Sequence, residues 1–161
     1  MMSNKMKFGL IPRVRVNYSY TDLLKALFVS ENSSSNRNCC EKFFSDFYGG
    51  RHVYLVGSGR AALYLILKSL YQKKIVLPAY NCAVVTEVAE YAGKEIIYAE
   101  CDRQTFNIRS LPPLDKDTVV VAAHQYGLPC DIKAIKKACN EAGAVLIEDC
   151  AAALGTIGDG Q

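Results

Sequence analysis

From residue 53 onward, short apolar runs alternate with amphipathic segments, and this alternation constrains the fold of the 161-residue chain more than any other feature. Strands that alternate with helices form right-handed crossovers between parallel strands. The stretches VVVAA and AVLI, which end at Ala123 and Ile147, are continuously apolar, as is typical of strands buried on both faces. The sequence therefore predicts a three-layer α/β fold, in which a mainly parallel sheet carries helices on both faces.

The predicted elements follow from apolar spacing and from the residues that begin and end helices. Asp131 is the expected N-cap of a helix over 132–142, and Gly143 stands just beyond its end. The polar stretch 30–38 is predicted to be a loop. Further helices are predicted over 21–29, 40–48, 60–71 and 82–91, and strands over 53–56, 75–77, 95–99, 117–123 and 144–147.

Two regions differ in pattern. Residues 1–50 are predicted to form an N-terminal helical segment, in which Phe43, Phe44 and Phe47 share one helical face and belong to a core. Residues 51–161 carry the alternating strands and helices and are predicted to form part of an α/β domain.

The composition is that of an ordinary globular protein, with 50% hydrophobic and 22% charged residues. The formal charge of +3 is spread over the chain without a basic run, so nucleic acid is not an expected partner. Seven cysteines without a Cys-x-x-Cys spacing favour free thiols in a reducing cytoplasm over disulfides or a zinc site. No run resembles a signal peptide or a membrane span, so a membrane is not an expected partner either.

Polar and glycine-rich residues gather where the predicted strands end. They occupy positions 57–59, 78–82, 124–127 and 148–149, each directly after an apolar run. The carboxyl ends of parallel strands meet at one edge of the sheet, and ligands of open α/β sheets bind there. The sequence therefore predicts that these four groups border one binding site.

Gly57, Ser58 and Gly59, together with Ala62, satisfy the G-x-G-x-x-A pattern of dinucleotide sites. Such sites also need an acid at the end of the next strand to bind the ribose, and the stretch after Leu77 contains no carboxylate. A nucleotide-dependent oxidoreductase is thereby disfavoured. Free backbone N–H groups and the helix dipole still suit a single phosphate monoester. A tight turn that binds nothing is an equal alternative.

Glu148 and Asp149 end the last predicted strand, so one carboxylate is expected to face the cleft and the other to point away. An acid there can hold a metal, orient a base, pair with a protonated ring nitrogen, or simply cap the following turn. His124 is compatible with a general base, a stacking partner or a hydrogen-bonded core histidine, the usual outcome for a lone histidine. No base can be placed beside Cys82 or Cys150, and no metal cluster is predicted.

Several blocks occur in an order that carries a family likeness. VGSGRAAL is similar to Ser-Gly-Thr-x-Ala-Leu, and the block that starts with VLPAYNC is similar to a Val-x-x-Pro-x-x-Thr block. HQYGLP matches His-x-x-Gly-x-Pro, and EDCAAALG matches Glu-Asp-x-Ala-x-x-x-Gly. In this order the blocks resemble the fold type I aminotransferases that depend on pyridoxal 5'-phosphate (PLP), and within them the DegT/StrS family, which aminates keto-sugar nucleotides. The resemblance covers nearly all of residues 40–155.

The resemblance implies roles for the candidate residues. Ser58, Gly59 and Arg60 fall where a loop and a helix N-terminus of the family hold the PLP phosphate. Asp149 falls on the acid that pairs with the pyridine nitrogen and keeps it protonated, so that the ring can act as an electron sink. Arg60 stands where the family usually has a threonine.

Two further positions of the resemblance concern the cofactor ring. Cys82 stands where the family has the residue that covers the ring face, commonly an aromatic one. Ala152 stands where a glutamine or histidine often bonds the phenolic oxygen of the cofactor. Weaker contacts to the ring are expected at both positions.

The Schiff-base lysine of the family lies downstream of the Glu-Asp block in a Ser-x-x-Lys motif, and no lysine of this sequence matches it. The expectation is an N-terminal, cofactor-cradling part of a sugar-nucleotide aminotransferase, without the small C-terminal domain and inactive alone. A sugar nucleotide, an amino-acid donor and a second copy of the subunit are the partners implied for the full-length enzyme. The alternative is a non-catalytic module of the same fold that binds a phosphorylated ligand or a partner protein.

Overall fold

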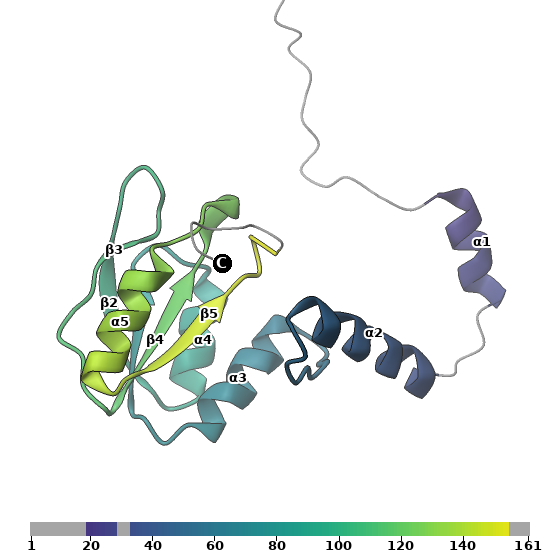
Figure 1. The fold of residues 1–161 in the computed structure, drawn as a ribbon. Coiled ribbons are helices and arrows are strands. Elements are labelled where there is room, and N and C mark those ends of the chain that lie inside the picture. Colours follow the sequence, from purple (N-terminus) through teal and green to yellow (C-terminus); the bar gives the residue numbers. More distant parts are fainter. Residues whose placement is uncertain (1–18, 29–32, 155–161) are drawn as a thin grey trace, which may run out of the picture. The chain divides into compact units, whose positions relative to one another are not determined.

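The computed structural model describes residues 19–28 and 33–154 (Figure 1). The chain divides into two compact units, residues 1–55 and residues 56–161. The first unit contains α1 (Tyr20–Phe28) and α2 (Ser33–Phe47). In the described residues, no helix is both long enough and apolar enough to cross a membrane.

Helix α2 differs from its prediction in two ways. It begins at Ser33, so residues 33–38 are helical although a loop was predicted over 30–38; residues 30–32 lie outside the described residues. Its aromatic face is not buried, because Phe43 is 63% exposed and Phe47 is exposed as well. The rings of these two residues stack on each other, with centroids 6.5 Å apart. The prediction that they belong to a core is therefore wrong within this unit.

A five-stranded sheet forms the centre of the second unit. Its strands are β1 (Lys74–Pro78), β2 (Glu95–Cys101), β3 (Ile108–Ser110), β4 (Thr118–Ala123) and β5 (Val145–Asp149). The order across the sheet is β3-β2-β1-β4-β5, and the pairs β2–β1, β1–β4 and β4–β5 are parallel. Among the described strands, only the short β3, which the sequence did not predict, pairs antiparallel, with β2. The mainly parallel sheet is therefore confirmed.

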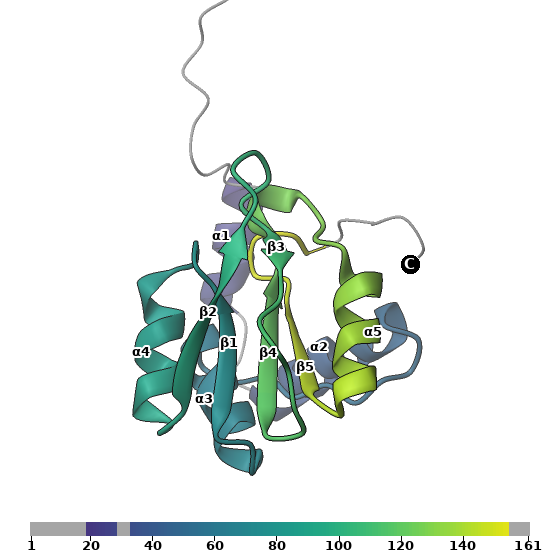
Figure 2. The same ribbon diagram turned by 90° about the vertical axis from the view of Figure 1, so that its left-hand side faces the viewer.

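Helices cover both faces of this sheet (Figures 1 and 2). They are α3 (Gly59–Ser69), α4 (Ala83–Tyr91) and α5 (Ile132–Ala142). Alternate residues of β4 face opposite sides of the sheet, so Val119 and Val121 pack with α3 and α4, whereas Val120 and Ala122 pack with α5. All four side chains are almost fully buried, which explains the continuous apolar run VVVAA.

Residues at the ends of two helices satisfy their backbone groups, and the two predicted for α5 do so as expected. The Asp131 carboxylate accepts a hydrogen bond from the Ala134 N–H at 3.0 Å and caps α5. Gly143 ends that helix in the left-handed conformation, with φ of 69°, which a residue without a side chain adopts at no steric cost. At α3, the hydroxyl of Ser58 accepts a hydrogen bond from the Ala61 N–H at 3.2 Å.

The strand predicted over 53–56 is absent, since the structure shows no regular element between residues 51 and 57. Tyr54 and Val56 are exposed, and none of the five described strands pairs with the segment. The β-branched and aromatic composition of the segment favours an extended backbone, but a strand also needs hydrogen bonds from a neighbour. The prediction of a strand over 53–56 is therefore wrong, because the segment has no partner strand among the described residues.

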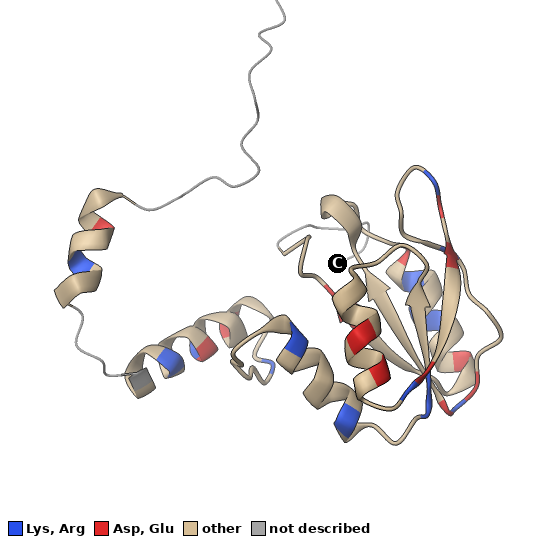
Figure 3. Cartoon of the chain, turned by 180° about the vertical axis from the view of Figure 1, so that it is seen from behind, with Lys and Arg blue, Asp and Glu red and all other residues tan. Residues whose placement is uncertain are grey.

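The amino-terminal edge of the sheet is closed by ionic and polar contacts. The Lys74 ammonium lies 2.7 Å from the Asp115 carboxylate, and the Thr118 hydroxyl donates to the same carboxylate at 2.6 Å. These hydrogen bonds, that of Lys74 first, lower the pKa of Asp115 to about 2. Elsewhere in this unit, Lys and Arg are interspersed with Asp and Glu over helices and loops (Figure 3).

Candidate functional site

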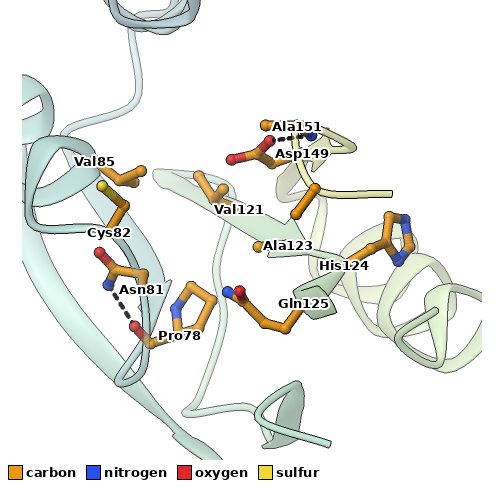
Figure 4. Close-up of a pocket in the computed structure, with 11 residues that line it drawn as sticks. Pro78, Asn81, Cys82, Val85, Val121, Ala123, His124, Gln125, Asp149 and Ala151 are labelled. Atoms are coloured by element: carbon orange, nitrogen blue, oxygen red, sulfur yellow. Dashed lines mark hydrogen bonds between the residues drawn. The ribbon is translucent and has the colours of Figure 1, made fainter. Parts of the chain in front are cut away.

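The loops after β1, β4 and β5 meet at the carboxyl edge of the sheet and border one pocket (Figure 4). Its polar side chains are Asn81, Cys82, His124, Gln125 and Asp149. Its apolar walls come from Pro78, Val85, Val121, Ala123, Ala151 and Ala152. Three of the four predicted groups of polar residues therefore come together, because parallel strands deliver their carboxyl ends to one edge.

Asp149, the last residue of β5, carries the carboxylate of this pocket (Figure 4). Its Oδ1 accepts a hydrogen bond from the Ala151 N–H at 2.9 Å, which fixes the orientation of the side chain. In the described part of the chain, no hydrogen bond occupies Oδ2. The carboxylate therefore keeps an acceptor free beside apolar walls, where a cationic or N–H group of a ligand would find a strong partner.

Glu148 points away from the pocket, as the alternation along a strand predicts, and pairs with His124. The Glu148 carboxylate lies 2.8 Å from Nε2 of His124, a side chain only 7% exposed. Nδ1 of the same ring accepts the Cys130 N–H at 3.0 Å. Since Nδ1 accepts, the ring proton resides on Nε2 and is donated to Glu148. Of the interpretations considered for His124, the hydrogen-bonded core histidine is the correct one.

The same hydrogen bonds bear on metal binding. His124, Glu148 and Cys150 place one ligand atom each within 4.8 Å of one another. A metal at Nε2 of His124 would require the ring proton to move to Nδ1, which already accepts the Cys130 N–H. Burial and the neighbouring Glu148 and Asp149 carboxylates also raise the pKa of the Cys150 thiol, which disfavours the thiolate that a metal needs. The cluster is therefore better explained as a carboxylate–histidine pair.

Ser58, Gly59 and Arg60 are not among the residues that line the pocket. They begin α3, and the short connection 70–73 joins the end of this helix to the start of β1, so the helix begins toward the carboxyl edge. A Cβ atom placed on Gly57 or Gly59 would meet no atom within 4 Å. The backbone of this turn is thus open to an approaching group, while the Ser58 hydroxyl is already used as a helix cap.

Cys82 and Ala152 do line the pocket, as the resemblance implies for residues beside a cofactor ring. Cys82 precedes α4 and is exposed, and its thiol makes no cap hydrogen bond. Asn81, for which the sequence suggested no role of its own, donates from Nδ2 to the Pro78 carbonyl at 2.6 Å and so holds the turn after β1. Its position in a polar stretch after a strand was the only signal.

An aromatic cluster of Tyr80, Phe106 and Tyr126 adjoins the pocket and was not predicted. The ring centroids of Tyr80 and Phe106 are 4.7 Å apart, and the hydroxyl groups of Tyr80 and Tyr126 share a hydrogen bond, which is the main cause of a raised pKa of Tyr80. Phe106 and Tyr126 both have positive φ, 60° and 54°. Three separate loops contribute these rings, so no local pattern in the sequence could bring them together.

Comparison with known proteins identifies a family profile and relatives that are similar to this chain. Residues 21–161 match the profile of the DegT/DnrJ/EryC1/StrS aminotransferase family. GDP-perosamine synthase of Vibrio cholerae is 29% identical over 128 residues, which are 75% of this chain and 35% of that protein. The dTDP-3-amino-3,6-dideoxy-alpha-D-galactopyranose transaminase of Aneurinibacillus thermoaerophilus is 29% identical over 129 residues, with the same two shares. The chain thus spans about a third of the length of these curated relatives.

A solved structure shares the fold over almost the whole chain. GDP-4-keto-6-deoxymannose-3-dehydratase, solved with a trapped PLP-glutamate geminal diamine, aligns with a TM-score of 0.75 and 17% identity. The alignment covers 93% of this chain and 43% of that protein. This likeness confirms the predicted α/β fold class, a mainly parallel sheet with helices on both faces.

Proposed function

This chain belongs to the DegT/DnrJ/EryC1/StrS aminotransferase family, and on that premise we propose that it forms the cofactor-holding part of a sugar-nucleotide aminotransferase. The cofactor supported by the family and by the PLP-bound neighbours is pyridoxal 5'-phosphate. The observation that carries the proposal is the Asp149 carboxylate, which the Ala151 N–H orients in a pocket with apolar walls.

The residues of the pocket suit a pyridinium ring. Asp149 would hold the proton of the ring nitrogen, and the apolar walls formed by Val85, Val121 and Ala152 would contact the ring and exclude water. Cys82 would contact the ring with a sulfur atom in place of an aromatic side chain. When bound, the protonated ring supplies an electron sink for transfer of an amino group.

The start of α3 would hold the phosphate. The N-terminus of a helix offers backbone N–H groups and positive potential to an anion. The open space before Gly57 and Gly59 admits a phosphate close to the backbone, and Arg60 adds a cation one residue later. Ser58, Gly59 and Arg60 are therefore proposed as the phosphate-binding residues, with the Ser58 hydroxyl shared between the helix cap and the ligand.

We propose that the chain supplies the residues that hold the cofactor but not the Schiff-base lysine, since no lysine is among the residues that line the pocket. In the complete enzyme, a sugar nucleotide and an amino-acid donor are the proposed substrates, and a homodimer is the proposed assembly. The 161 residues alone are accordingly expected to bind the cofactor without transaminase activity.

Binding of pyridoxamine 5'-phosphate (PMP) tests the proposal. PMP lacks the aldehyde of PLP and so forms no adducts with surface lysines. In a fluorescence titration of the 161-residue chain, Asp149→Asn should weaken PMP binding about ten-fold or more, because a charge-assisted hydrogen bond contributes about 1.5–3 kcal/mol.

The matched control is Glu141→Gln, which removes one negative charge from the exposed surface of α5 and should leave PMP binding unchanged. Equal PMP affinity of Asp149→Asn and the parent chain would contradict the proposal. Binding of inorganic phosphate without any preference for PMP would favour the non-catalytic phospho-ligand module instead.

A further inference from the structure

We propose that the aromatic cluster of Tyr80, Phe106 and Tyr126 is a stacking platform for the base of a nucleoside diphosphate sugar. The inference rests on the proposed function, because it names how that site recognises its second substrate. None of these three aromatic residues takes part in the contacts proposed for the cofactor.

The cluster is continuous with the pocket. Tyr80 precedes the pocket residue Asn81, and Tyr126 follows the pocket residue Gln125. The Gln125 side chain donates from Nε2 to the Tyr80 carbonyl at 3.3 Å and so ties the loops after β1 and β4 together. A molecule that reached from the pocket along Gln125 would meet these rings next.

The geometry leaves one ring available. Phe106 lies against Tyr80 with their planes tilted by 35°, and Tyr80 is 42% exposed. Tyr126 meets Phe106 edge-on, at 72°, and remains 66% exposed. Tyr80 and Phe106 thus support Tyr126, whose ring faces solvent as a planar apolar surface.

The turn that presents Tyr126 is held under strain. A left-handed backbone suits glycine or asparagine, and a bulky aromatic residue there is uncommon. Buried Asn107, 5% exposed, brackets the turn, because its Oδ1 accepts the Gln125 N–H at 3.1 Å and its Nδ2 donates to the Leu128 carbonyl at 3.0 Å. Strain that surrounding structure maintains is a feature of ligand sites, and Asn107 acts here as a positioning residue.

A nucleotide base fits this surface better than a charged ligand does. The three side chains are uncharged, and the Tyr80 and Tyr126 hydroxyls already bond to each other. Stacking on an aromatic face tolerates any base, because every base has a π-face. The platform would therefore contribute affinity for the nucleotide part of the substrate without selecting one base.

The experiment compares UMP, GMP and ribose 5-phosphate in NMR titrations of the 161-residue chain. Both nucleotides should bind about ten-fold tighter than ribose 5-phosphate, as expected for one stacked base. Tyr126→Asn removes the ring with a residue that accepts the left-handed turn, and Tyr126→Leu keeps apolar bulk without a π-face. Each variant should abolish the ten-fold difference, whereas Tyr126→Phe should retain it.

The matched control is Tyr71→Asn, since Tyr71 is 79% exposed in the connection between α3 and β1. This variant should bind all three probes like the parent. Equal affinity of the parent for nucleotides and ribose 5-phosphate would overturn the inference, as would a ten-fold preference that survives in both Tyr126→Asn and Tyr126→Leu. PMP titration separates the two proposals. If PMP binding depends on Asp149 but nucleotides bind no tighter than ribose 5-phosphate, only the stacking platform is contradicted. If nucleotides bind tighter than ribose 5-phosphate but PMP binding does not depend on Asp149, the stacking platform is supported and the proposed cofactor site is contradicted.

Discussion

The two edges of the sheet use polar residues in different ways. At the amino edge they bind one another: Lys74 and Thr118 satisfy Asp115, and Asp117 accepts the Lys73 N–H at 2.9 Å. At the carboxyl edge, Asp149 keeps an oxygen directed to a pocket. One polar atom at the amino edge is left unpaired: Oε1 of buried Gln72 has no hydrogen-bond partner in the described part of the chain. The difference indicates that the polar residues of the amino edge stabilise the fold, while those of the carboxyl edge are available to bind ligands.

His124 breaks this division, because it lies at the carboxyl edge and yet serves the fold. His124→Ala should lower the free energy of unfolding by about 2–4 kcal/mol, since it leaves the Cys130 N–H and the Glu148 carboxylate without this partner and creates a cavity. Urea denaturation measures the change. His52→Ala, at an exposed position, is the control and should stay within about 0.5 kcal/mol of the parent. A small effect at His124 would mean that the pair is dispensable for folding.

Ser58→Asp changes a residue that is proposed to bind a ligand, and it should affect binding more than stability. Aspartate caps helices as well as serine does, so stability should change little, while the new carboxylate should repel the phosphate of PMP. We expect about a ten-fold loss of PMP affinity, equivalent to about 1.4 kcal/mol. Unaltered PMP affinity, with binding of unphosphorylated pyridoxamine as the reference, would show that the phosphate lies elsewhere.

Gly143→Ala tests the amino edge, where α5 ends and the chain enters β5. The left-handed φ of 69° should cost about 1 kcal/mol with alanine, and the added Cβ would meet Lys116 Cβ at an ordinary 3.6 Å, so strain and not collision is the cause. Thermal denaturation should show the loss, and PMP titration should show none. A change in PMP affinity would contradict the separation of the two edges.

The smallest effect is expected at Asp115, and it depends on pH. The folded-state pKa of about 2 lies below the ordinary 3.8, so the stabilising contribution is present above about pH 4 and is lost as the pH falls toward 2. Asp115→Asn should therefore be less stable than the parent at pH 7, and the gap should close between pH 4 and pH 2. Urea denaturation across this range measures the gap, with Glu141→Gln as the charge-matched control. A gap independent of pH would refute the assignment.

Much of the site could be predicted because parallel strands carry their carboxyl ends to one edge. Cys82, Asp149 and Ala152 were predicted beside a ligand and do line one pocket, although their contacts with a cofactor stay predictions. The phosphate role of Ser58, Gly59 and Arg60 is likewise a prediction. The sequence suggested no role for Phe106 or Asn107, because the residues that they contact lie in other loops. These partners are Tyr80, Gln125 and Tyr126.

Features that depend on nearby residues could be predicted from the amino-acid sequence. The continuous apolar run of β4, the Asp131 cap and the Gly143 helix end each follow from side-chain periodicity or backbone preference over a few positions. Features that depend on partners far away in the chain became visible in the folded structure. Residues 53–56 have the composition of a strand and no described partner strand, and His124 became a core residue because Cys130 and Glu148 occupy both ring nitrogens. Hydrogen bonds between segments far apart in the chain are set by packing, which local preference does not encode.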